Sequence, residues 1–332
     1  MKTRVALLVM VFFLLLHHNA PAVAATPSPN RVVITSASFS EREGALFVAQ
    51  DQGLFRKYDL DVQLVYVSSG AVAVSALVAG ESHFYYGSAS GATLGAVVGG
   101  LDAVFVAGLI HKLTGALVVI PDIKSPSDLK GKRIGITSIG GGNWMYTMLA
   151  FDYWGLDPKR DGISFRVIGN NSVRAQSITS GVIDGSVLSY TFASRLKREG
   201  YRILADLSSL DIPYQDMGLF ARRSFVNQFP DVTEKALRAL VEAITFIQEP
   251  ANRAAVMRSM ARWLRLPRVE DAADGYEFMQ TLYDRRIYPS VDGLRNTIRV
   301  LGITNEKIRR LKAEDLADDR FVKKLEKDGL FR

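Results

Sequence analysis

The chain has 332 residues, of which 48% are hydrophobic and 23% are charged, and its formal net charge is +7 at pH 7. This composition is typical of a compact globular protein, and the length suits two units that each bury a core. The basic residues are spread along the chain without interleaved aromatic residues, which argues against a nucleic-acid-binding protein. There is no cysteine, which excludes disulfides, a thiol nucleophile and thiolate metal ligands.

The first 25 residues have the order of a secretory signal peptide. Lys2 and Arg4 precede an apolar run of 12 residues, Val5 to Leu16, and the small residues at 22–25 offer a cleavage site. A membrane-spanning helix needs about 20 apolar residues, so this run is too short for a permanent anchor. We therefore expect cleavage after Ala24 or Ala25 and a periplasmic protein with no stable membrane anchor and no lipid on an N-terminal cysteine.

Strands and helices alternate in the body of the chain. Apolar runs bounded by turn residues predict strands, and apolar residues at helical spacing predict helices. The expected order is a strand at 32–34, a loop at 35–40, a helix at 44–58, a strand at 61–67, a helix at 71–79 and a strand at 84–86. This alternation predicts a parallel-type sheet that is covered by helices.

The same order returns about a hundred residues later. It consists of a strand at 133–136, a helix at 143–154, a strand at 163–168, a helix at 174–180 and a strand at 187–188. Four landmark pairs are offset by 101 or 102 residues, namely Ser36 with Ser138, Gly53 with Gly155, Gly80 with Gly181, and Ser88 with Ser189. Chance produces one or two such pairs more easily than four in order, so the sequence predicts two lobes of one βαβαβ design.

Two connections join the predicted lobes and form a hinge. The chain leaves the first lobe through an apolar strand at 116–120 and returns near 208–218, before a strand at 219–221. We expect the first part of lobe 1 at 28–119, lobe 2 at 120–215, and the second part of lobe 1 at 216–332. In that last part, apolar stripes at helical spacing predict C-terminal helices that pack on the first lobe.

Five segments carry a resemblance to a known family. They are GALFVAQDQGLFRKYDLDVQLVYV, ALVAGESHFYYGSAS, IKSPSDLKGKRIGI, GLDPKRDGISFRVIG and AQSITSGVIDGSVLSY, in this order within Val32 to Val241. The most specific piece is DLKGKRIG, from Asp128 to Gly135. In these segments the chain resembles the substrate-binding proteins of ABC importers for nitrate, sulfonates, taurine and thiamine precursors.

The resemblance implies an α/β fold of the type II periplasmic-binding class, with a ligand site in the cleft between the lobes. It implies a monomeric binding protein without a cofactor, not an enzyme, that captures a small organic or oxyanionic solute. The partners that it implies are this solute and the permease of an ABC importer with its ATPase. One position departs from the family, because His83 stands where the family often has Asp, as Asp184 does in the second lobe.

The candidate ligand-binding residues lie where strands end and helices begin. Ligands of open α/β sheets bind there, and free N–H groups at a helix start favour anions. By the repeat, loop 38–40 is expected to face 140–142, residues 69–70 to face 170–171, and 88–90 to face 189–191. The full candidate set is Ser38, Phe39, Ser40, Glu41, Ser69, Gly70, Ser88, Ala89, Ser90, His111, Ser138, Gly140, Gly141, Gly142, Asn143, Trp144, Asn170, Ser189, Tyr190, Thr191 and Asp216.

Several candidates have a second interpretation. Trp144 lies against an organic ligand or belongs to the core, and Glu41 either caps a helix or favours a ligand with a donor group. His111 lines the cleft or is a core histidine. Asp216 bonds the ligand or braces the hinge. Arg174 is a counter-ion for an anionic ligand or an exposed residue on its helix, and we favour the exposed position.

Two other functions remain open at this point. An enzyme would use Ser38, Ser88 or Ser189 as nucleophile, but only His83 and His111 remain after signal removal, and neither lies in a catalytic motif. With two histidines and no cysteine, a metal site is not expected either. Eukaryotic relatives of the family include a pyrimidine-forming enzyme, whose cysteine- and histidine-rich site this chain lacks. A receptor for a membrane sensor would use the same closing clamp as a transport protein, and the loops leave the identity of the solute open.

Overall fold

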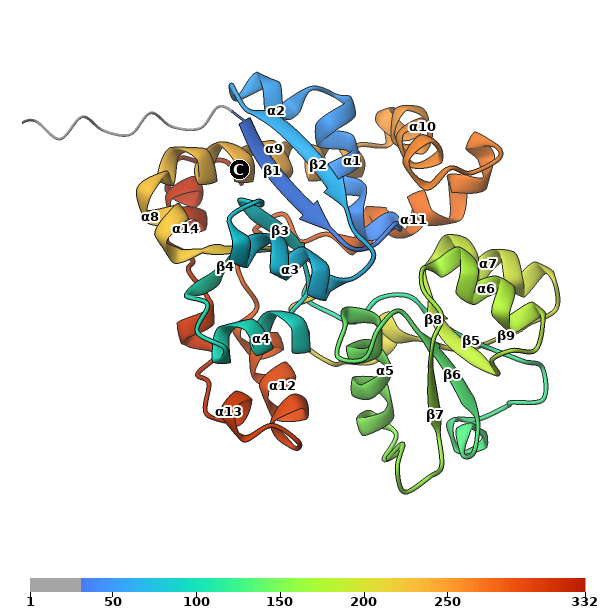
Figure 1. The fold of residues 1–332 in the computed structure, drawn as a ribbon. Coiled ribbons are helices and arrows are strands. Elements are labelled where there is room, and N and C mark those ends of the chain that lie inside the picture. Colours follow the sequence, from blue (N-terminus) through green and yellow to red (C-terminus); the bar gives the residue numbers. More distant parts are fainter. Residues whose placement is uncertain (1–30, 332) are drawn as a thin grey trace, which may run out of the picture.

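Two five-stranded sheets, each with helices packed on it, build two lobes (Figure 1). The computed structural model describes residues 31–331, so the expected signal peptide lies outside the described residues. In chain order, the strands are β1 (Arg31–Ser36), β2 (Asp61–Tyr66), β3 (Phe84–Gly87), β4 (Ala103–Gly108), β5 (Ala116–Val119), β6 (Arg133–Ile136), β7 (Ser164–Val167), β8 (Gly185–Leu188), β9 (Arg202–Asp206) and β10 (Gly218–Arg222). The first sheet has the order β2-β1-β3-β10-β4, and the second has the order β7-β6-β8-β5-β9.

Each sheet is mixed, which corrects the expectation of a parallel-type sheet. β1 pairs in parallel with β2 and β3, and β6 pairs in parallel with β7 and β8. β10 and β5 are antiparallel to both of their neighbours, because each enters its sheet directly from a crossing between the lobes. β5 was expected to close the first part of lobe 1, but its pairing with β8 and β9 places it in the second sheet.

The α-helices lie mainly where the sequence predicts them. Their bounds are α1 (Gly44–Asp51), α2 (Leu54–Lys57), α3 (Gly70–Ala79), α4 (Gly91–Val98), α5 (Gly142–Tyr153), α6 (Asn171–Thr179), α7 (Tyr190–Arg198), α8 (Arg223–Gln228), α9 (Pro230–Gln248), α10 (Arg253–Leu264), α11 (Ala273–Leu282), α12 (Val291–Gly302), α13 (Glu306–Arg309) and α14 (Arg320–Lys327). Short 3₁₀ helices are η1 (Glu41–Glu43), η2 (Pro126–Leu129), η3 (Leu207–Ser209), η4 (Pro250–Asn252), η5 (Val269–Ala272) and η6 (Glu314–Leu316). The single helix expected at 44–58 is broken into α1 and α2, because Gly53 takes a left-handed conformation with φ of 68°.

The repeat is visible as β1-α1-β2-α3-β3 in one lobe and β6-α5-β7-α6-β8 in the other (Figure 1). Asp184 accepts a hydrogen bond from the backbone N–H of Arg133 at 2.7 Å, at the start of β6. In the first lobe, His83 Nδ1 accepts from the backbone N–H of Val33 in β1 at 3.0 Å. Burial lowers the pKa of His83, and Arg222 adds to this effect, so the neutral ring can accept that bond. His83 therefore performs the task of the acid at the matching position.

The C-terminal helices pack on the first lobe, as expected. α9, α10, α11 and α14 share a hydrophobic cluster with β1, α1 and β3, and Leu237, Leu240 and Ile244 of α9 are fully buried there. α12 and α13 belong to a second cluster, which contains Phe105 of β4 and continues to Leu149 of α5 in the second lobe. This second cluster joins the two lobes beside the crossings.

The two crossings lie side by side and are hydrogen-bonded to each other. The backbone N–H of Tyr214 donates to the carbonyl of His111 at 2.9 Å, and that of Asp216 donates to the carbonyl of Ile110 at 3.0 Å. Lys112 and Pro213 form an isolated antiparallel bridge between the same segments. This is the two-crossing hinge that the sequence predicts.

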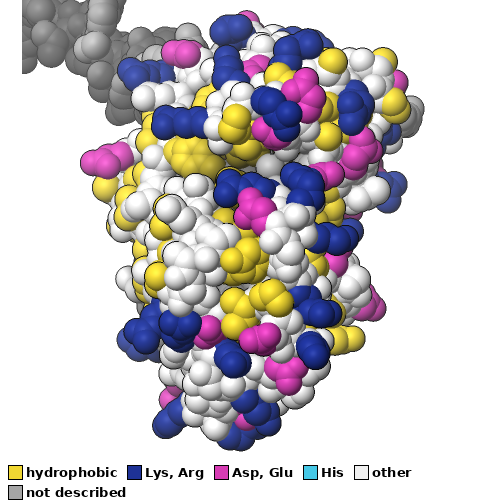
Figure 2. Space-filling view, turned by 90° about the vertical axis from the view of Figure 1, so that its right-hand side faces the viewer, with side chains coloured by type: hydrophobic (Ala, Val, Ile, Leu, Met, Phe, Trp, Pro, Cys, Tyr) yellow, Lys and Arg dark blue, Asp and Glu magenta, His cyan; other side chains and the backbone are white. Residues whose placement is uncertain are grey.

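Charge on the surface is mixed. On the face drawn in Figure 2, Lys and Arg side chains are interspersed with Asp and Glu. Exposed ion pairs occur in the described part of the chain, such as Arg195 and Glu199, which lie four residues apart with a distance of 2.9 Å. Within residues 31–331, no helix has both the length and the apolar character that crossing a membrane requires.

Candidate functional site

A cavity of about 490 Å³ lies between the two lobes. Its walls are formed by residues at and after the carboxyl ends of β1, β2 and β3, and of β6, β7 and β8. Thr114 and Met217 reach the cavity from the two crossings. This is the place in an open α/β sheet where ligands bind, and the volume is in the range of small-molecule sites, about 300–1,000 Å³.

The cavity brings together the serine- and glycine-rich loops of both lobes. The candidate residues that line it are Ser38, Phe39, Glu41, Gly70, Ser88, Ser138, Gly141, Gly142, Asn143, Asn170 and Ser189. Both lobes therefore present hydroxyl groups to one shared space, and the second lobe adds the side-chain amides of Asn143 and Asn170.

The other candidates do not line the cavity. Ser40, Ser69 and Ser90 are the N-caps of η1, α3 and α4. Ala89 is buried, and its N–H donates to the carbonyl of Gln215 at 2.9 Å. These loop residues shape the helix starts, since a capping side chain satisfies N–H groups that the helix leaves free.

Trp144 and His111 also lie elsewhere. Trp144 packs on the core at the edge of Phe165, with ring centroids 6.3 Å apart. His111 places Nε2 2.9 Å from the carbonyl of Gly108, and its Nδ1 is 3.3 Å from Asp284. The core interpretation therefore fits Trp144, and His111 belongs to the hinge.

The loops of the two lobes face each other crosswise, which corrects the expected pairing. A Cβ on Gly91, next to Ser90, would lie 3.0 Å from the carbonyl oxygen of Gly140, and one on Gly142 would lie 2.5 Å from Ser88 Oγ. Loop 88–91 thus faces 140–142, and Glu41 reaches 189–191 instead. The physical reason is that two similar lobes meet face to face, so equivalent loops lie at opposite ends of the cleft.

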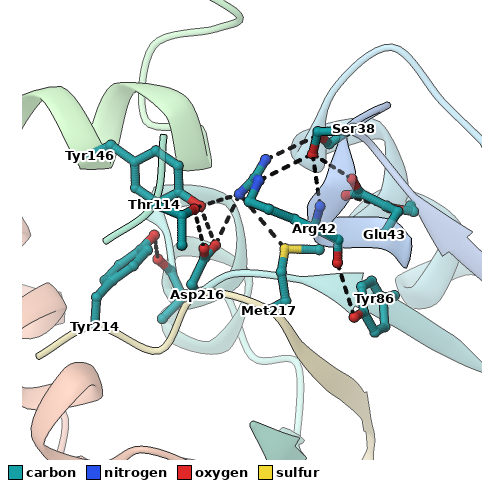
Figure 3. Close-up of polar contacts among 12 residues, drawn as sticks. Ser38, Arg42, Glu43, Tyr86, Thr114, Tyr146, Tyr214, Asp216 and Met217 are labelled. Atoms are coloured by element: carbon teal, nitrogen blue, oxygen red, sulfur yellow. Dashed lines mark hydrogen bonds and ion pairs between the residues drawn. The ribbon is translucent and has the colours of Figure 1, made fainter. Parts of the chain in front are cut away.

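Arg42 is the centre of a buried network between the lobes and the crossings (Figure 3). Its Nη1 lies 2.9 Å from Asp216 Oδ1 and also contacts Tyr146 Oη of α5. Thr114 donates to Asp216 Oδ2 at 2.8 Å, and Tyr146 donates to Oδ1. Ser38 accepts from Arg42 Nη2 at 3.0 Å. Asp216 therefore braces the hinge from beneath the cavity.

The charges in this network depend on one another. Burial raises the pKa of Asp216, although the adjacent guanidinium of Arg42 and the donors Tyr146 and Thr114 oppose the rise. Burial alone would lower the pKa of Arg42, but the oxygens of Tyr146, Asp216 and Glu43 around it raise it well above its usual value. Arg42 is thus a permanent cation whose counter-ion comes from the second crossing.

Glu41 of η1 connects the first lobe to the start of α7 in the second. Its carboxylate accepts from the backbone N–H of Tyr190, and Thr191 Oγ1 donates to it at 3.4 Å. The ring of Tyr190 lies against Phe278 of α11, with centroids 3.7 Å apart. Tyr190 and Thr191 are therefore contacts between the lobes and hold them together through Glu41.

Replacing Glu41 by Gln is expected to make stability less dependent on pH. Burial raises the pKa of Glu41 above 4.5, and the bonds from Tyr190 and the charge of Arg42 oppose this only in part. A carboxyl with a raised pKa favours the folded, closed protein at low pH, and this contribution is lost as the pH rises from the ordinary value through the raised one. The variant should therefore gain stability over the parent as the pH rises from about 4 to about 8.

The measurement is chemical denaturation of parent and variant across that pH range. Gln keeps an acceptor oxygen for the N–H of Tyr190, so the comparison isolates the charge. Glu199→Gln, in the exposed pair with Arg195, is the matched control and should change the free energy of unfolding by less than about 1 kcal/mol. If the free energy of unfolding of Glu41→Gln, relative to that of the parent, falls as the pH rises, the expectation is contradicted.

Arg174 lines the cavity from α6 and is only 3% exposed, so the expected exposed position is wrong. Its guanidinium donates to Ser186 Oγ at 3.0 Å, Thr137 Oγ1 at 2.7 Å and Asn171 Oδ1 at 3.0 Å, and also to backbone carbonyls. Burial lowers the pKa of Arg174 to about 9, with a further effect of Arg42, so it is charged at neutral pH. α6 begins at Asn171, three residues before the expected start, and Arg174 lies on its buried face together with Ala175 and Ile178.

Aromatic side chains line the first-lobe wall, and the sequence analysis did not assign them to the site. Tyr66, Tyr85 and Tyr86 come from the ends of β2 and β3, and Phe278 comes from α11. The ring of Tyr66 stacks on that of Phe39 with centroids 4.4 Å apart. A signal was present, since tyrosines at the last positions of strands reach the edge where ligands bind.

A family model described as NMT1/THI5 like matches residues 42–254 of the chain. This range includes the residues of both cavity walls except those of the first loop before Arg42 and Phe278 of α11. A comparison with curated proteins finds no match.

Solved structures share the fold over most of their length. A protein from Bordetella bronchiseptica RB50 has a TM-score of 0.78 at 21% identity, with 91% of this chain and 98% of that chain covered. The alkanesulfonate-binding protein SsuA from Xanthomonas axonopodis pv. citri has a TM-score of 0.69 at 18% identity, with 87% of this chain and 96% of that chain covered. The periplasmic nitrate-binding protein NrtA from Synechocystis PCC 6803 has a TM-score of 0.72 at 13% identity, with 91% of this chain and 89% of that chain covered. The chain thus has the two-lobed α/β fold of periplasmic binding proteins.

The desulfurization enzyme DszB also shares the fold. Its TM-score is 0.60 at 17% identity, with 90% of this chain and 100% of that chain covered. The same architecture therefore carries both binding proteins and an enzyme, so function has to be argued from the site.

Proposed function

Because the chain belongs to the NMT1/THI5-like family, we propose that it is an extracytoplasmic binding protein for a small organic or oxyanionic solute. The protein captures this solute in the cavity and delivers it to the permease and ATPase of an ABC importer. The observation that carries the proposal is the cavity of about 490 Å³, which has hydroxyl groups on both walls and amide groups on the second-lobe wall. The names of two proteins with the same fold, which bind alkanesulfonate and nitrate, agree with a solute of this kind.

The proposed mechanism is closure of the lobes around the solute. Glu41 with Tyr190, and Gly91 with Gly140, are contacts that exist only while the lobes are together. A solute that touches both walls adds its own contacts to the closed form and shifts the population toward it. A micromolar dissociation constant corresponds to about 8 kcal/mol, which is enough to favour closure and still bind.

A solute screen by thermal unfolding tests the proposal. The panel contains inorganic oxyanions, sulfonates, carboxylates and pyrimidines, and a bound solute at 100 times its dissociation constant adds about 2.7 kcal/mol of stability. We expect at least one solute to raise the melting temperature in a saturable way. The same solute should reduce the radius of gyration in small-angle X-ray scattering. A panel without any such solute would contradict the proposal.

The same screen separates binding from catalysis. An enzyme of the DszB kind would convert its solute, and chromatography of the mixture would then show a product that grows with time. The two described histidines, His83 and His111, pair with strand β1 and with the hinge, which supports binding over hydrolysis by an activated serine. Stimulation of a reconstituted importer's ATPase distinguishes delivery from reporting to a sensor.

A further inference from the structure

The two walls of the cavity differ in chemistry. The second-lobe wall carries amide and hydroxyl groups, such as Asn143, Asn170 and Ser138, and its charged lining residue is Arg174. The first-lobe wall has hydroxyl groups too, on Ser38 and Ser88, but it differs by its aromatic rings and by the charged residues at 41–43. A solute between them therefore meets a cationic side and an aromatic side.

Arg174 has no carboxylate partner among the described residues. Its hydrogen-bond acceptors are hydroxyl, amide and backbone carbonyl oxygens, all of them neutral. A buried charge is costly unless an opposite charge compensates for it. Arg42 in the first lobe is different, because Asp216 neutralises it at 2.9 Å. On the second-lobe wall the uncompensated charge is thus a positive one at α6, and this wall calls for an anionic group.

The acids on the opposite wall have donors within the protein. Glu43 Oε2 accepts from Ser40 Oγ at 2.8 Å, and Glu41 accepts from Tyr190 and Thr191. Burial raises the pKa of Glu41 and of Glu43, which disfavours their charged forms, and their oxygens already have donors, so neither acid requires an amine from the solute. A net charge of minus one on the solute is therefore sufficient to compensate Arg174.

Tyr66 supplies a second group without a partner. Its hydroxyl is buried and has no hydrogen-bond partner among the described residues, while its ring stacks on Phe39 at 4.4 Å. Burial raises the pKa of Tyr66, with a smaller effect of Glu43, so the hydroxyl keeps its proton and is a donor. A buried donor without an acceptor is costly, and an acceptor atom on the solute would relieve that cost.

Resting on the proposed function, we propose that the solute is an aromatic monoanion, a carboxylate or a sulfonate, whose charged group pairs with Arg174. Its ring lies along the aromatic wall of Phe39, Tyr66 and Phe278, and a polar substituent on the far side of the ring accepts from the Tyr66 hydroxyl. A cavity of about 490 Å³ is much larger than a bare oxyanion, and a ring fills the part that the anionic group leaves.

Calorimetric titration with a set of matched probes tests the charge and the ring. The probes are benzoate, benzenesulfonate, the neutral benzamide, and the anions ethanesulfonate and nitrate, which lack a ring. We expect benzoate or benzenesulfonate to bind at least about 10-fold more tightly than the other three, since each missing group loses a contact worth about a factor of ten. Equal binding of benzamide, or tighter binding of nitrate or ethanesulfonate, would overturn the proposal.

Two variants assign the contacts. Arg174→Met should weaken benzoate or benzenesulfonate binding about 100-fold, while Arg166→Met, at an exposed arginine of the same lobe, should leave it unchanged. We expect the parent protein to bind 4-hydroxybenzoate about 3- to 10-fold more tightly than benzoate, and Tyr66→Phe should remove this preference. Its control, Tyr153→Phe, changes a residue that is 57% exposed. If circular dichroism shows that Arg174→Met does not fold, the relative affinities of the probe set and of Tyr66→Phe still test the proposal.

The outcome also separates this proposal from the proposed function. If no aromatic monoanion binds but another solute of the broad panel raises the melting temperature, the proposal of an aromatic anion is wrong and the proposed binding function stands. If no solute of either panel binds, both are wrong.

Discussion

Replacing Asp216 by Ala is expected to lower the free energy of unfolding by about 3 kcal/mol, the lower end of the range for breaking a buried ion pair. The change leaves the guanidinium of Arg42 buried without the partner that it has at 2.9 Å. It also removes the acceptor of Thr114 and Tyr146. Glu43 is close enough to raise the pKa of Arg42, so it compensates in part and keeps the loss near the lower end.

Urea denaturation of the variant and the parent measures this loss. The control is Glu199→Ala, which breaks the exposed pair with Arg195 and should cost less than about 1 kcal/mol. A loss for Asp216→Ala as small as that of the control would show that the network at the hinge contributes little to stability.

Replacing Gly91 by Val is expected to hold the lobes apart and to weaken solute binding about 10- to 100-fold. In the closed form a Cβ at this position lies 3.0 Å from the Gly140 carbonyl oxygen and 3.2 Å from its Cα. These are backbone atoms, which cannot turn aside as a flexible side chain does. Overpacking of this kind typically costs about 1–3 kcal/mol, and each 1.4 kcal/mol is a factor of ten in affinity.

Gly95 provides the matched control, because it lies one turn further along α4 and a Cβ there meets no atom within 4 Å. We expect Gly95→Val to bind and close like the parent. Scattering should give Gly91→Val a larger radius of gyration than Gly95→Val, with similar melting temperatures in the absence of solute. An affinity of Gly91→Val equal to that of Gly95→Val would show that this contact is not part of closure.

The repeat in the sequence predicts most of what positions the site. Landmarks such as Gly53 and Gly155 preserve their spacing because both take a left-handed conformation at the same turn, with φ of 68° and 67°. This register gives the two lobes and the loops that line the cavity. The elements that follow the repeated part in each lobe were not predicted, namely α4 and β4 in the first lobe and α7 and β9 in the second. The limits of the domains remain a prediction, except that β5 belongs to the second sheet.

The remaining errors concern relations that a linear pattern does not contain. The order of loops along the chain says nothing about how two lobes face each other, so the crosswise arrangement of 88–91 with 140–142 was missed. The exposed position was favoured for Arg174 because arginine is mostly a surface residue, but in the structure Arg174 shares the buried face of α6 with Ala175 and Ile178. Arg42 and Asp216 form an ion pair although they lie 174 residues apart in the sequence, and no local sequence pattern predicts a contact at that separation.

The order of strands in the two sheets also determines which sheet can be finished first. All strands of the second sheet lie between Ala116 and Asp206, in one uninterrupted stretch of chain. In the first sheet, β4 is connected to β3 only through β10, which begins at Gly218. A nascent chain that extends to Asp206 thus contains every strand of the second sheet, while β4 still lacks its neighbour. The sheet whose strands come first in the chain is therefore the one that is completed last.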